Sequence, residues 1–382
     1  MIEPENGSPP EYGYRVLIAP MGLLDAIRRA RSPFERAGSP PPPNVDLPKV
    51  RVLIVYLFEG VGDAWLLGPA LAALLEAGAR PPIGILAPPT AIRALRLFDL
   101  PLRFHPIVDS TDTDTRSAVQ ELEAKIRRRR YDIAVDLTLR KGRDSRRWLL
   151  ASGAKTRLGW RTKSERADVS PLTHGILDQR GQAERHWSRY LVAPLTPLGV
   201  TSPRYDLPFR TSDTARGRAQ ALLGDRPRVV LVPGAKASSK QWGPDHFERI
   251  GRTIIDRFSG SVVVVGAPSE GKAIRSLTRS IGKGASAYTQ KGLDVVKELI
   301  DNADAVVTSD TGPMHLSFLL HKPTISVFTS MSPVCWGPWK TDPRFVILRA
   351  PTGEDPSHMG LGHVWAKAIE GYLSRMLEDG DQ

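Results

Sequence analysis

The chain has 382 residues, 41% of them hydrophobic and 25% charged, with a formal net charge of +12 at pH 7. This length allows two domains of ordinary size, and the composition is that of a folded globular protein rather than a disordered one. The single cysteine, Cys335, excludes an internal disulfide and a zinc site built on paired cysteines. No apolar run is long enough to span a bilayer, and the acidic, proline-bearing start is not a secretory signal, so we expect a cytoplasmic protein.

The first 48 residues differ in composition from the rest of the chain. They contain 10 of the 33 prolines, including the run from 40 to 43. We interpret residues 1–48 as a proline-rich, weakly ordered leader with no catalytic role. Within it, residues 21–31 have the basic amphipathic pattern of helices that touch membrane surfaces.

An alternation of strands and helices begins at Lys49. The strands that we expect here are residues 50–56, 83–86 and 133–137. The expected helices are residues 64–77, 118–130 and 146–152. This alternation predicts right-handed βαβ units and a parallel sheet, which form an N-terminal domain over residues 49–205.

The alternation restarts after a polar, proline-marked stretch at residues 201–227. The expected strands are residues 228–232, 262–265, 305–307 and 324–328. The expected helices are residues 246–258, 295–302 and 314–320, with a terminal helix at 362–377. The sequence therefore predicts a second α/β domain at 226–350 and a tail at 351–382. Ligand sites in such sheets lie beyond the carboxyl ends of the strands.

The segment 309–316, SDTGPMHL, joins a hydrophobic strand to a helix. Its small residues permit a tight turn, and the helix start offers free N–H groups and a partial positive charge to a phosphate. The carboxylate of Asp310 is placed to bind sugar hydroxyls. The alternative is that Asp310 or Thr311 only caps the helix.

The segment 232–244 also follows a strand and begins with Pro233 and Gly234. Two hydroxyls, Ser238 and Ser239, stand beside Lys240 in this loop, which is a composition that suits a diphosphate. The alternative is an ordinary surface loop with solvated lysines.

The turn at 59–63 ends the first strand of the N-terminal domain with Gly62 and Asp63. A carboxylate at this position could take a proton from an acceptor hydroxyl. The alternative for Asp63 is again a helix cap. A dinucleotide fingerprint is excluded, because its third glycine would fall at Trp65.

The segment 266–273 follows a strand and nearly fits the phosphate-binding loop of ATPases and GTPases. Ala273 stands where that loop needs a serine or threonine hydroxyl for Mg²⁺. We therefore interpret the segment as a loop near the nucleotide, with Glu270 in contact with its ribose or base. A phosphotransferase that uses Lys272 is the alternative.

Positive charge is concentrated between residues 125 and 166, where 15 Lys and Arg stand against 4 Asp and Glu. Such a concentration suggests an anionic partner: a phosphorylated glycolipid, a membrane surface or a nucleic acid. The alternative is a solvated helical face. No aromatic platform for stacking bases accompanies it, so we do not predict nucleic-acid binding.

Taken in this order, the loops resemble the ADP-heptose:lipopolysaccharide heptosyltransferases, glycosyltransferase family 9, over residues 50–340. The strongest element is SDTGPMHL at 309–316, followed by KP at 322–323 and WGP at 336–338. The segments PGA at 233–235, SKQW at 239–242, GD at 62–63 and YDIAVDL at 131–137 also resemble the family.

The resemblance implies an α/β protein of GT-B architecture, with two Rossmann-like, doubly wound domains facing a central cleft. The acceptor would bind the N-terminal domain and the nucleotide sugar the C-terminal domain. Asp63 would be the general base, and Lys240 would hold the diphosphate. The remaining donor-binding residues would be Gly62, Ser238, Ser239, Glu270, Asp310, Thr311, Gly312 and His315.

We therefore predict an inverting glycosyltransferase that needs no metal and no cofactor. Its donor would be similar to ADP-heptose, and its acceptor an anionic glycolipid or polysaccharide of lipopolysaccharide or cell-envelope synthesis. A further prediction is peripheral contact with the inner face of the membrane. The alternative is a catalytically inactive nucleotide-sugar-binding protein of the same fold.

Overall fold

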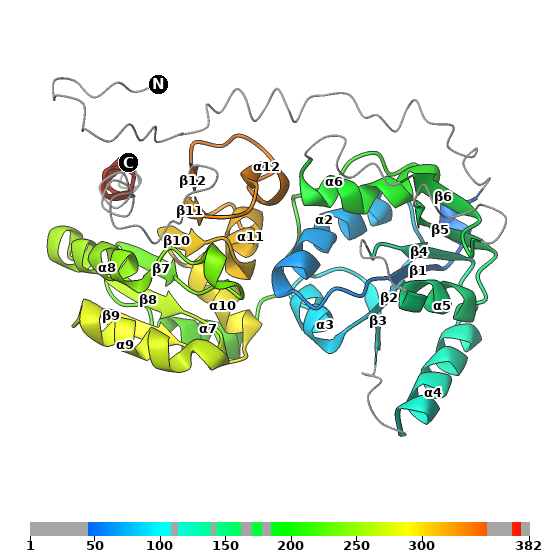
Figure 1. Ribbon diagram of the computed structural model, residues 1–382, viewed down its shortest axis with the longest axis horizontal. Helices are drawn as coiled ribbons and strands as arrows, with labels where there is room; N and C mark the ends of the chain where they lie inside the picture. Colours follow the sequence, from blue (N-terminus) through cyan, green and yellow to red (C-terminus); the bar gives the residue numbers. More distant parts are fainter. Residues whose placement is uncertain are drawn as a thin grey trace. The chain divides into compact units, whose positions relative to one another are not determined.

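The computed structural model describes residues 45–107, 114–138, 143–161, 170–177, 185–349 and 369–375. These residues form two compact units that meet in the chain between Arg210 and Thr211, here called the N-terminal and C-terminal units (Figure 1). Most of the predicted leader, including 21–31, and most of the predicted tail lie outside the described residues. No described helix is both long and apolar enough to cross a membrane.

The N-terminal unit contains one six-stranded sheet in which every pairing is parallel. The strand order is β3-β2-β1-β4-β5-β6. The elements in chain order are β1 (Val52–Val55), α2 (Val61–Glu76), β2 (Ile83–Ala87), α3 (Pro89–Leu95), β3 (Leu102–Pro106), α4 (Asp114–Arg128), β4 (Ile133–Asp136), α5 (Arg143–Ala151), β5 (Thr156–Arg161), β6 (His174–Leu177) and α6 (Trp187–Val192).

The C-terminal unit repeats this topology with a second six-stranded parallel sheet. Its strand order is β12-β11-β10-β7-β8-β9. The elements are α7 (Asp213–Gln220), β7 (Arg228–Val232), α8 (Pro244–Phe258), β8 (Ser261–Val265), α9 (Gly271–Ile281), β9 (Ala285–Tyr288), α10 (Leu293–Asp301), β10 (Ala305–Ser309), α11 (Gly312–Leu319), β11 (Thr324–Phe328), α12 (Pro333–Trp336) and β12 (Phe345–Arg349). The predicted α/β class and parallel sheets are confirmed.

Each sheet reverses its strand order once. In the N-terminal unit the chain builds β1 to β3 toward one edge and then returns to place β4 on the other side of β1. The C-terminal unit does the same with β10 and β7. At such a point the loops on either side diverge, which leaves room for a ligand beyond the carboxyl ends of the two strands.

Helices cover both faces of each sheet, so the strands are hydrophobic along their length rather than alternating (Figure 1). All five residues of β8, SVVVV, are buried. One face of this sheet is packed by apolar residues of α8 and α9 together with Ile369 and Leu373 of the described C-terminal helix. On the other face, Met314 and Phe318 of α11 pack with Phe328 and Phe345.

The structure differs from the sequence-based expectation chiefly at the sheet edges. The sequence did not predict the four edge strands β3, β6, β9 and β12, nor β5, which pairs with β6. Three of the five residues of β3 and three of the four of β9 are only half-buried, so their apolar pattern is diluted. The polar stretch at 201–227, for which we predicted no helix, contains helix α7.

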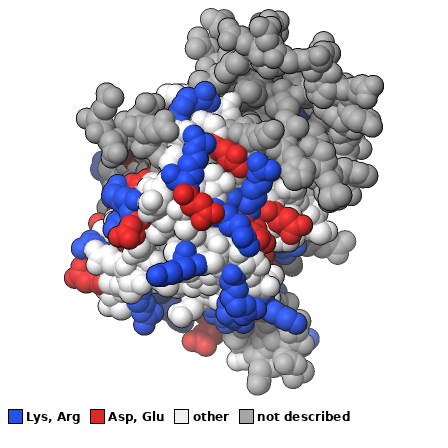
Figure 2. Space-filling view, turned by 90° about the vertical axis from the view of Figure 1, so that its left-hand side faces the viewer, with Lys and Arg blue, Asp and Glu red and all other residues white. Residues whose placement is uncertain are grey.

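The face of the C-terminal unit drawn in Figure 2 carries basic and acidic side chains close together. Along α8, for example, Arg252 lies 2.9 Å from Glu248. Because the two signs are interspersed there, this face has no concentration of positive charge comparable to that of residues 125–166.

Gly68 of α2 provides a test of the packing between helices. A Cβ at this position would lie 2.5 Å from Cε2 of Phe98, a fully buried ring. We expect Gly68→Ala to lower the free energy of unfolding by about 1–3 kcal/mol, because overpacking outweighs the helix propensity that alanine adds. Urea denaturation measures the difference.

Gly217, inside α7, is the matched control. It is exposed, and a Cβ there would have nothing within 4 Å. We expect Gly217→Ala to raise the free energy of unfolding by about 0.5–1 kcal/mol. The same sign of effect for both substitutions would contradict the packing of α2 described above.

Candidate functional site

A buried ion pair lies at the strand-order reversal of the C-terminal unit. Lys240 Nζ is 2.9 Å from Asp310 Oδ2. Lys240 ends the short helical turn η4 (Ser238–Lys240) that follows β7, and Asp310 directly follows β10. The Asp310 side chain is 3% exposed and that of Lys240 is 28% exposed, so the lysine is the more exposed partner.

Hydrogen bonds join the loops around this pair. The Ser309 hydroxyl donates to the Pro233 carbonyl over 3.1 Å, which connects the ends of β10 and β7. The Thr329 hydroxyl, just after β11, donates to the carbonyl of Ser239 over 2.5 Å. The side chains of Ser238 and Ser239 themselves are exposed. Because hydroxyl groups of two neighbouring loops donate to backbone carbonyls of the Lys240 loop, that loop is held in place on both sides of Lys240.

Burial dominates the electrostatics of Asp310. It raises the pKa of this carboxyl above the ordinary value of 3.8, although the charge of Lys240 and its hydrogen bond act in the opposite direction. Lys240 is the single described residue with a charge contact to Asp310 Oδ2. A carboxylate with one cationic partner and little solvent is costly to keep charged, which is typical of a functional site.

Helix α11 begins beside the pair. Thr311 is its N-cap residue, but its side chain makes no capping hydrogen bond, and Asp310 makes none either. The capping alternative is therefore not what the structure shows for these two residues. Thr311 and Gly312 are half-buried at the helix start, while His315 is buried one turn further, with its ring 6.2 Å from that of Trp336.

Glu270 lies against the loop after β7. Its Oε2 accepts a hydrogen bond from the Ala267 N–H over 2.7 Å. A Cβ on Gly234 would lie 2.1 Å from Glu270 Oε1, so a larger residue there would displace this carboxylate. Lys272 stands exposed in the first turn of α9. The segment thus brings an acidic residue, rather than a P-loop hydroxyl, to the Lys240 loop.

In the N-terminal unit, Gly62 and Asp63 lie in the first turn of α2, which begins at Val61 rather than at the predicted residue 64. Asp63 is half-buried, and its carboxylate folds back over Gly60, where a Cβ would lie 2.0 Å from Oδ2. The positive end of a helix stabilises a carboxylate in this turn. The charge of Asp63 adds to burial in raising the pKa of Tyr56, at the end of β1.

The structure therefore groups the predicted site residues by unit. Those in the C-terminal unit follow β7, β8 and β10; they are Ser238, Ser239, Lys240, Glu270, Asp310, Thr311, Gly312 and His315. Gly62 and Asp63 follow β1 in the other unit. The sequence interpretation did not single out Asp136, although it ends β4 as Asp310 follows β10. The recurrence of an aspartate at the end of the fourth strand of each unit was the available signal.

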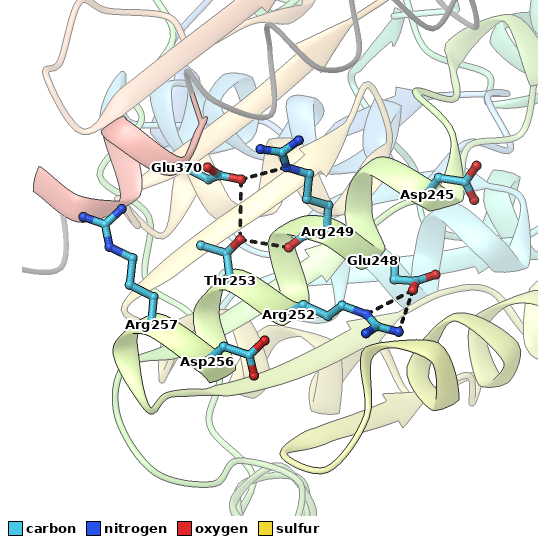
Figure 3. Close-up of a pocket in the computed structure, with 8 residues that line it drawn as sticks. All are labelled: Asp245, Glu248, Arg249, Arg252, Thr253, Asp256, Arg257 and Glu370. Carbon is cyan, nitrogen blue, oxygen red and sulfur yellow. Dashed lines mark hydrogen bonds and ion pairs between the residues drawn. The ribbon is translucent and has the colours of Figure 1, made fainter.

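A surface groove lies between α8 and the described C-terminal helix, lined by Arg249, Thr253 and Glu370 among others (Figure 3). Arg249 Nε donates to Glu370 Oε1 over 2.9 Å, and Arg252 is paired with Glu248. None of the predicted site residues lines this groove. Its charges are largely satisfied by each other, so we assign it no function.

The described residues contain no cluster of three or more His, Cys, Asp or Glu side chains that could hold a metal ion. The carboxylates nearest the predicted donor site are instead committed to Lys240 and to a backbone N–H.

Comparison with known proteins places this geometry in a family. Residues 119–358, more than half of the chain, match the model of glycosyltransferase family 9 (heptosyltransferase). Lipooligosaccharide heptosyltransferase 2 of Haemophilus influenzae is 25% identical over 210 residues, which cover 52% of this chain and 60% of that protein. The chain thus spans about three fifths of the length of this curated relative.

Solved structures show the same fold. ADP-heptose lipopolysaccharide heptosyltransferase II of E. coli matches 87% of this chain and 100% of its own, with 21% identity and a TM-score of 0.69. The E. coli heptosyltransferase WaaC with ADP matches 85% of this chain and 99% of its own, with 18% identity and a TM-score of 0.65. The predicted GT-B fold and family resemblance are both confirmed.

The raised pKa of Asp310 predicts a pH effect of definite sign. The folded protein holds this proton more tightly than the unfolded chain does, so the contribution of Asp310 to stability falls as pH rises from 3.8 through the raised pKa. We expect Asp310→Asn to gain stability relative to the wild type over that range. Urea denaturation at a series of pH values measures the gap.

Asp342→Asn is the control of opposite sign. Hydrogen bonds from Arg344 hold the pKa of Asp342 well below its ordinary value. Its stabilising contribution is therefore present at neutral pH and is lost as pH falls below 3.8 toward that pKa. Asp342→Asn should lose stability relative to the wild type as pH rises. A free energy of unfolding of Asp310→Asn that falls relative to the wild type as pH rises would contradict the burial of this carboxyl.

Proposed function

The chain belongs to glycosyltransferase family 9, and from that premise we propose that it transfers a heptose-like sugar from a nucleoside-diphosphate donor to an acceptor of lipopolysaccharide or cell-envelope glycan synthesis. One observation carries the proposal: the Lys240–Asp310 pair stands where the strand order of the C-terminal sheet reverses, beside the start of α11. This is where parallel α/β sheets bind phosphorylated ligands.

The donor is proposed to bind the C-terminal unit. Lys240 would pair with the diphosphate, and the backbone N–H groups of Thr311 and Gly312 would donate hydrogen bonds to its oxygens. The phosphate end would be lined by Ser238, Ser239 and His315. Asp310 would accept hydrogen bonds from hydroxyls of the sugar. Glu270 would accept hydrogen bonds from hydroxyls of the ribose. The structure of WaaC with ADP supports an adenine nucleotide as the donor's leaving group.

Asp63 is proposed as the general base, with Gly62 beside it. It stands in the first turn of α2, where the positive end of a helix stabilises negative charge, and a carboxylate is a group that accepts a proton in general base catalysis. Asp63 would remove the proton of an acceptor hydroxyl while the hydroxyl oxygen attacks the anomeric carbon. The bond from that carbon to the diphosphate oxygen would break in line, so the configuration inverts.

The departing diphosphate gains negative charge, which Lys240 and the N-terminus of α11 would stabilise. We propose that these two features supply the positive charge and that the transfer requires no divalent metal. The concentration of Lys and Arg at 125–166 supports an anionic glycolipid as the acceptor and peripheral contact with the inner membrane face as the setting of a cytoplasmic protein.

Asp63→Ala tests the base. We expect the transfer rate to fall by about 10²- to 10⁴-fold, because the acceptor hydroxyl loses its proton acceptor. Donor binding, measured by the thermal shift that ADP-heptose produces, should persist. Glu59→Ala is the control, since Glu59 is an exposed carboxylate of the same loop. Retained turnover in Asp63→Ala would show that Asp63 is not the base.

Donor binding without turnover in the wild type would favour the alternative, a catalytically inactive nucleotide-sugar-binding protein.

Lys240→Ala tests the source of positive charge. Losing one charge-assisted contact to the diphosphate should weaken ADP binding by about 10- to 100-fold and should slow transfer as well. Lys272→Ala is the control, because Lys272 is an exposed lysine in the first turn of α9, and it should leave both unchanged. Kinetics of Lys240→Ala equal to those of the wild type would refute the role of this lysine.

Loss of transfer in EDTA, restored by Mg²⁺, would show that a divalent metal supplies the positive charge.

A further inference from the structure

A group of exposed basic side chains stands at the end of α4. Lys125 and Arg127 to Arg130 occupy five of the last six positions before Tyr131, and all five side chains are exposed. We call these five residues the α4 basic end. Within the part of the chain that the structure describes, none of them forms an ion pair, whereas Arg147 of α5 is paired with Glu123 over 2.7 Å. Their charges therefore remain available to a partner.

The end of the helix does not itself require these five charges. A helix dipole favours positive charge near the last carbonyls, and Arg51 supplies it, because its Nη1 donates to the Arg129 carbonyl over 2.9 Å. Arg130 has a φ of 52°, the left-handed conformation in which helices usually place glycine. The one acidic residue between α4 and β4, Asp132, accepts the Arg51 backbone N–H over 2.8 Å. This turn thus has more positive charge than the helix end uses.

The buried groups under α4 lie in a field of positive charge. His105 of β3 is 1% exposed, and its Nε2 is 2.7 Å from the Tyr131 hydroxyl. The pKa of this histidine is lowered to about 4, first by burial and then by the charges of Lys125, Arg129 and Arg103. All the charges that act on it are positive. An excess of one sign that reaches buried groups also extends into the solvent beyond the exposed side chains.

The ends of α4 and α5 lie at the same edge of the sheet. α4 leads into β4 and α5 into β5, and the first residues of these parallel strands, Ile133 and Thr156, are paired. The two helices also pack beside each other (Figure 1). In the last turn of α5, Leu150 is 55% exposed, and among the described residues it is the one large hydrophobic side chain that is exposed. Lys155, also exposed, follows it before β5.

This combination fits a membrane surface better than a single anion. Successive side chains of a helix point about 100° apart, so the consecutive arginines spread around the end of α4 instead of converging on one phosphate. Anionic lipid head groups offer an extended field of negative charge, and the layer beneath them accepts an apolar side chain. Nucleic acid is disfavoured, because the aromatic side chains that pack under α4, Tyr131 and Trp148, are buried and offer no stacking surface.

We propose that the α4 basic end, with Leu150 and Lys155 beside it, is the surface by which the protein docks on a membrane of anionic phospholipids. This inference deepens the proposed peripheral contact and rests on the proposed function for that setting, but not for the transfer itself. Asp63 follows β1 at the carboxyl end of the sheet, whereas the α4 basic end lies at the amino end. The docking surface is therefore separate from the loop that would receive the acceptor.

Co-sedimentation of the full chain with lipid vesicles measures the contact. One set of vesicles consists of phosphatidylcholine, and the other of phosphatidylcholine and phosphatidylglycerol in equal parts. We expect the wild type to bind only the anionic set, with an affinity that falls as the salt concentration rises. The triple variant Lys125→Gln, Arg127→Gln, Arg128→Gln should bind it about 100-fold more weakly, since each cation near an anionic surface contributes about 5-fold.

A second triple variant is the matched control. Lys272, Arg275 and Arg279 are exposed cations of one helix, α9, in the C-terminal unit. Their joint replacement by Gln removes the same charge and should leave vesicle binding at the wild-type level. Leu150→Ser should weaken binding by about 5-fold, and this loss should persist at high salt, because salt does not screen apolar burial. The comparison of the two vesicle sets with the wild type stands even if a variant fails to fold.

Equal binding of the wild type to both vesicle sets, or no binding to the anionic set, would overturn the inference. Equal losses in the two triple variants would also overturn it, because net charge alone would then decide. Binding of single-stranded RNA without binding of either vesicle set would overturn it in favour of nucleic acid.

Sedimentation needs neither donor nor acceptor, so the docking surface and the transfer can fail separately. A chain that docks through the α4 basic end and transfers nothing contradicts the proposed transfer and leaves the docking surface intact. An active chain that binds no anionic vesicles contradicts the docking surface and leaves the transfer intact.

Discussion

The parallel pairing of β1 with β4 and of β7 with β10 is the constraint on which the rest of the structure depends. Each pairing joins strands that are far apart in the chain, and each places two strand ends side by side while the following helices separate to opposite faces. Every polar group with a proposed role in donor binding or in catalysis stands on a loop that leaves one of these sheets or at the start of the helix that follows the loop. The chemistry is therefore positioned by strand order, while the loops and helix starts supply the side chains and the backbone N–H groups.

Both reversal points contain an aspartate that is buried and paired with a longer cationic side chain. Such pairs contribute little net stability, because the cost of removing charge from water offsets most of the attraction. Their effect is on geometry, because the buried carboxylate fixes the position of the cationic side chain, which is the more exposed partner. The two units thus use one arrangement twice, once with the point charge of a lysine and once with the planar guanidinium of an arginine.

Strand positions at the centre of both sheets could be predicted from sequence because these strands are continuous apolar runs, as in VVVV of β8. Edge strands such as β3 and β9 could not, because half-exposed positions dilute the pattern. Asp310 and Lys240 stood out as polar residues after such runs, yet their mutual contact depends on the β7–β10 pairing, which no local pattern encodes. Asp136 was missed for a related reason: its contact with Arg146 depends on the place of β4 in the sheet, which no local pattern encodes.

The Lys240–Asp310 pair has a consequence for turnover. The lysine lies 2.9 Å from a carboxylate of its own chain. A diphosphate that pairs with Lys240 must compete with that carboxylate, which is held beside the ammonium group at a very high effective concentration. If Lys240 holds the diphosphate as proposed, the Asp310 carboxylate pairs with the lysine again each time the nucleotide departs. This competition weakens the binding of the product nucleotide, and therefore product inhibition, without any movement of the backbone.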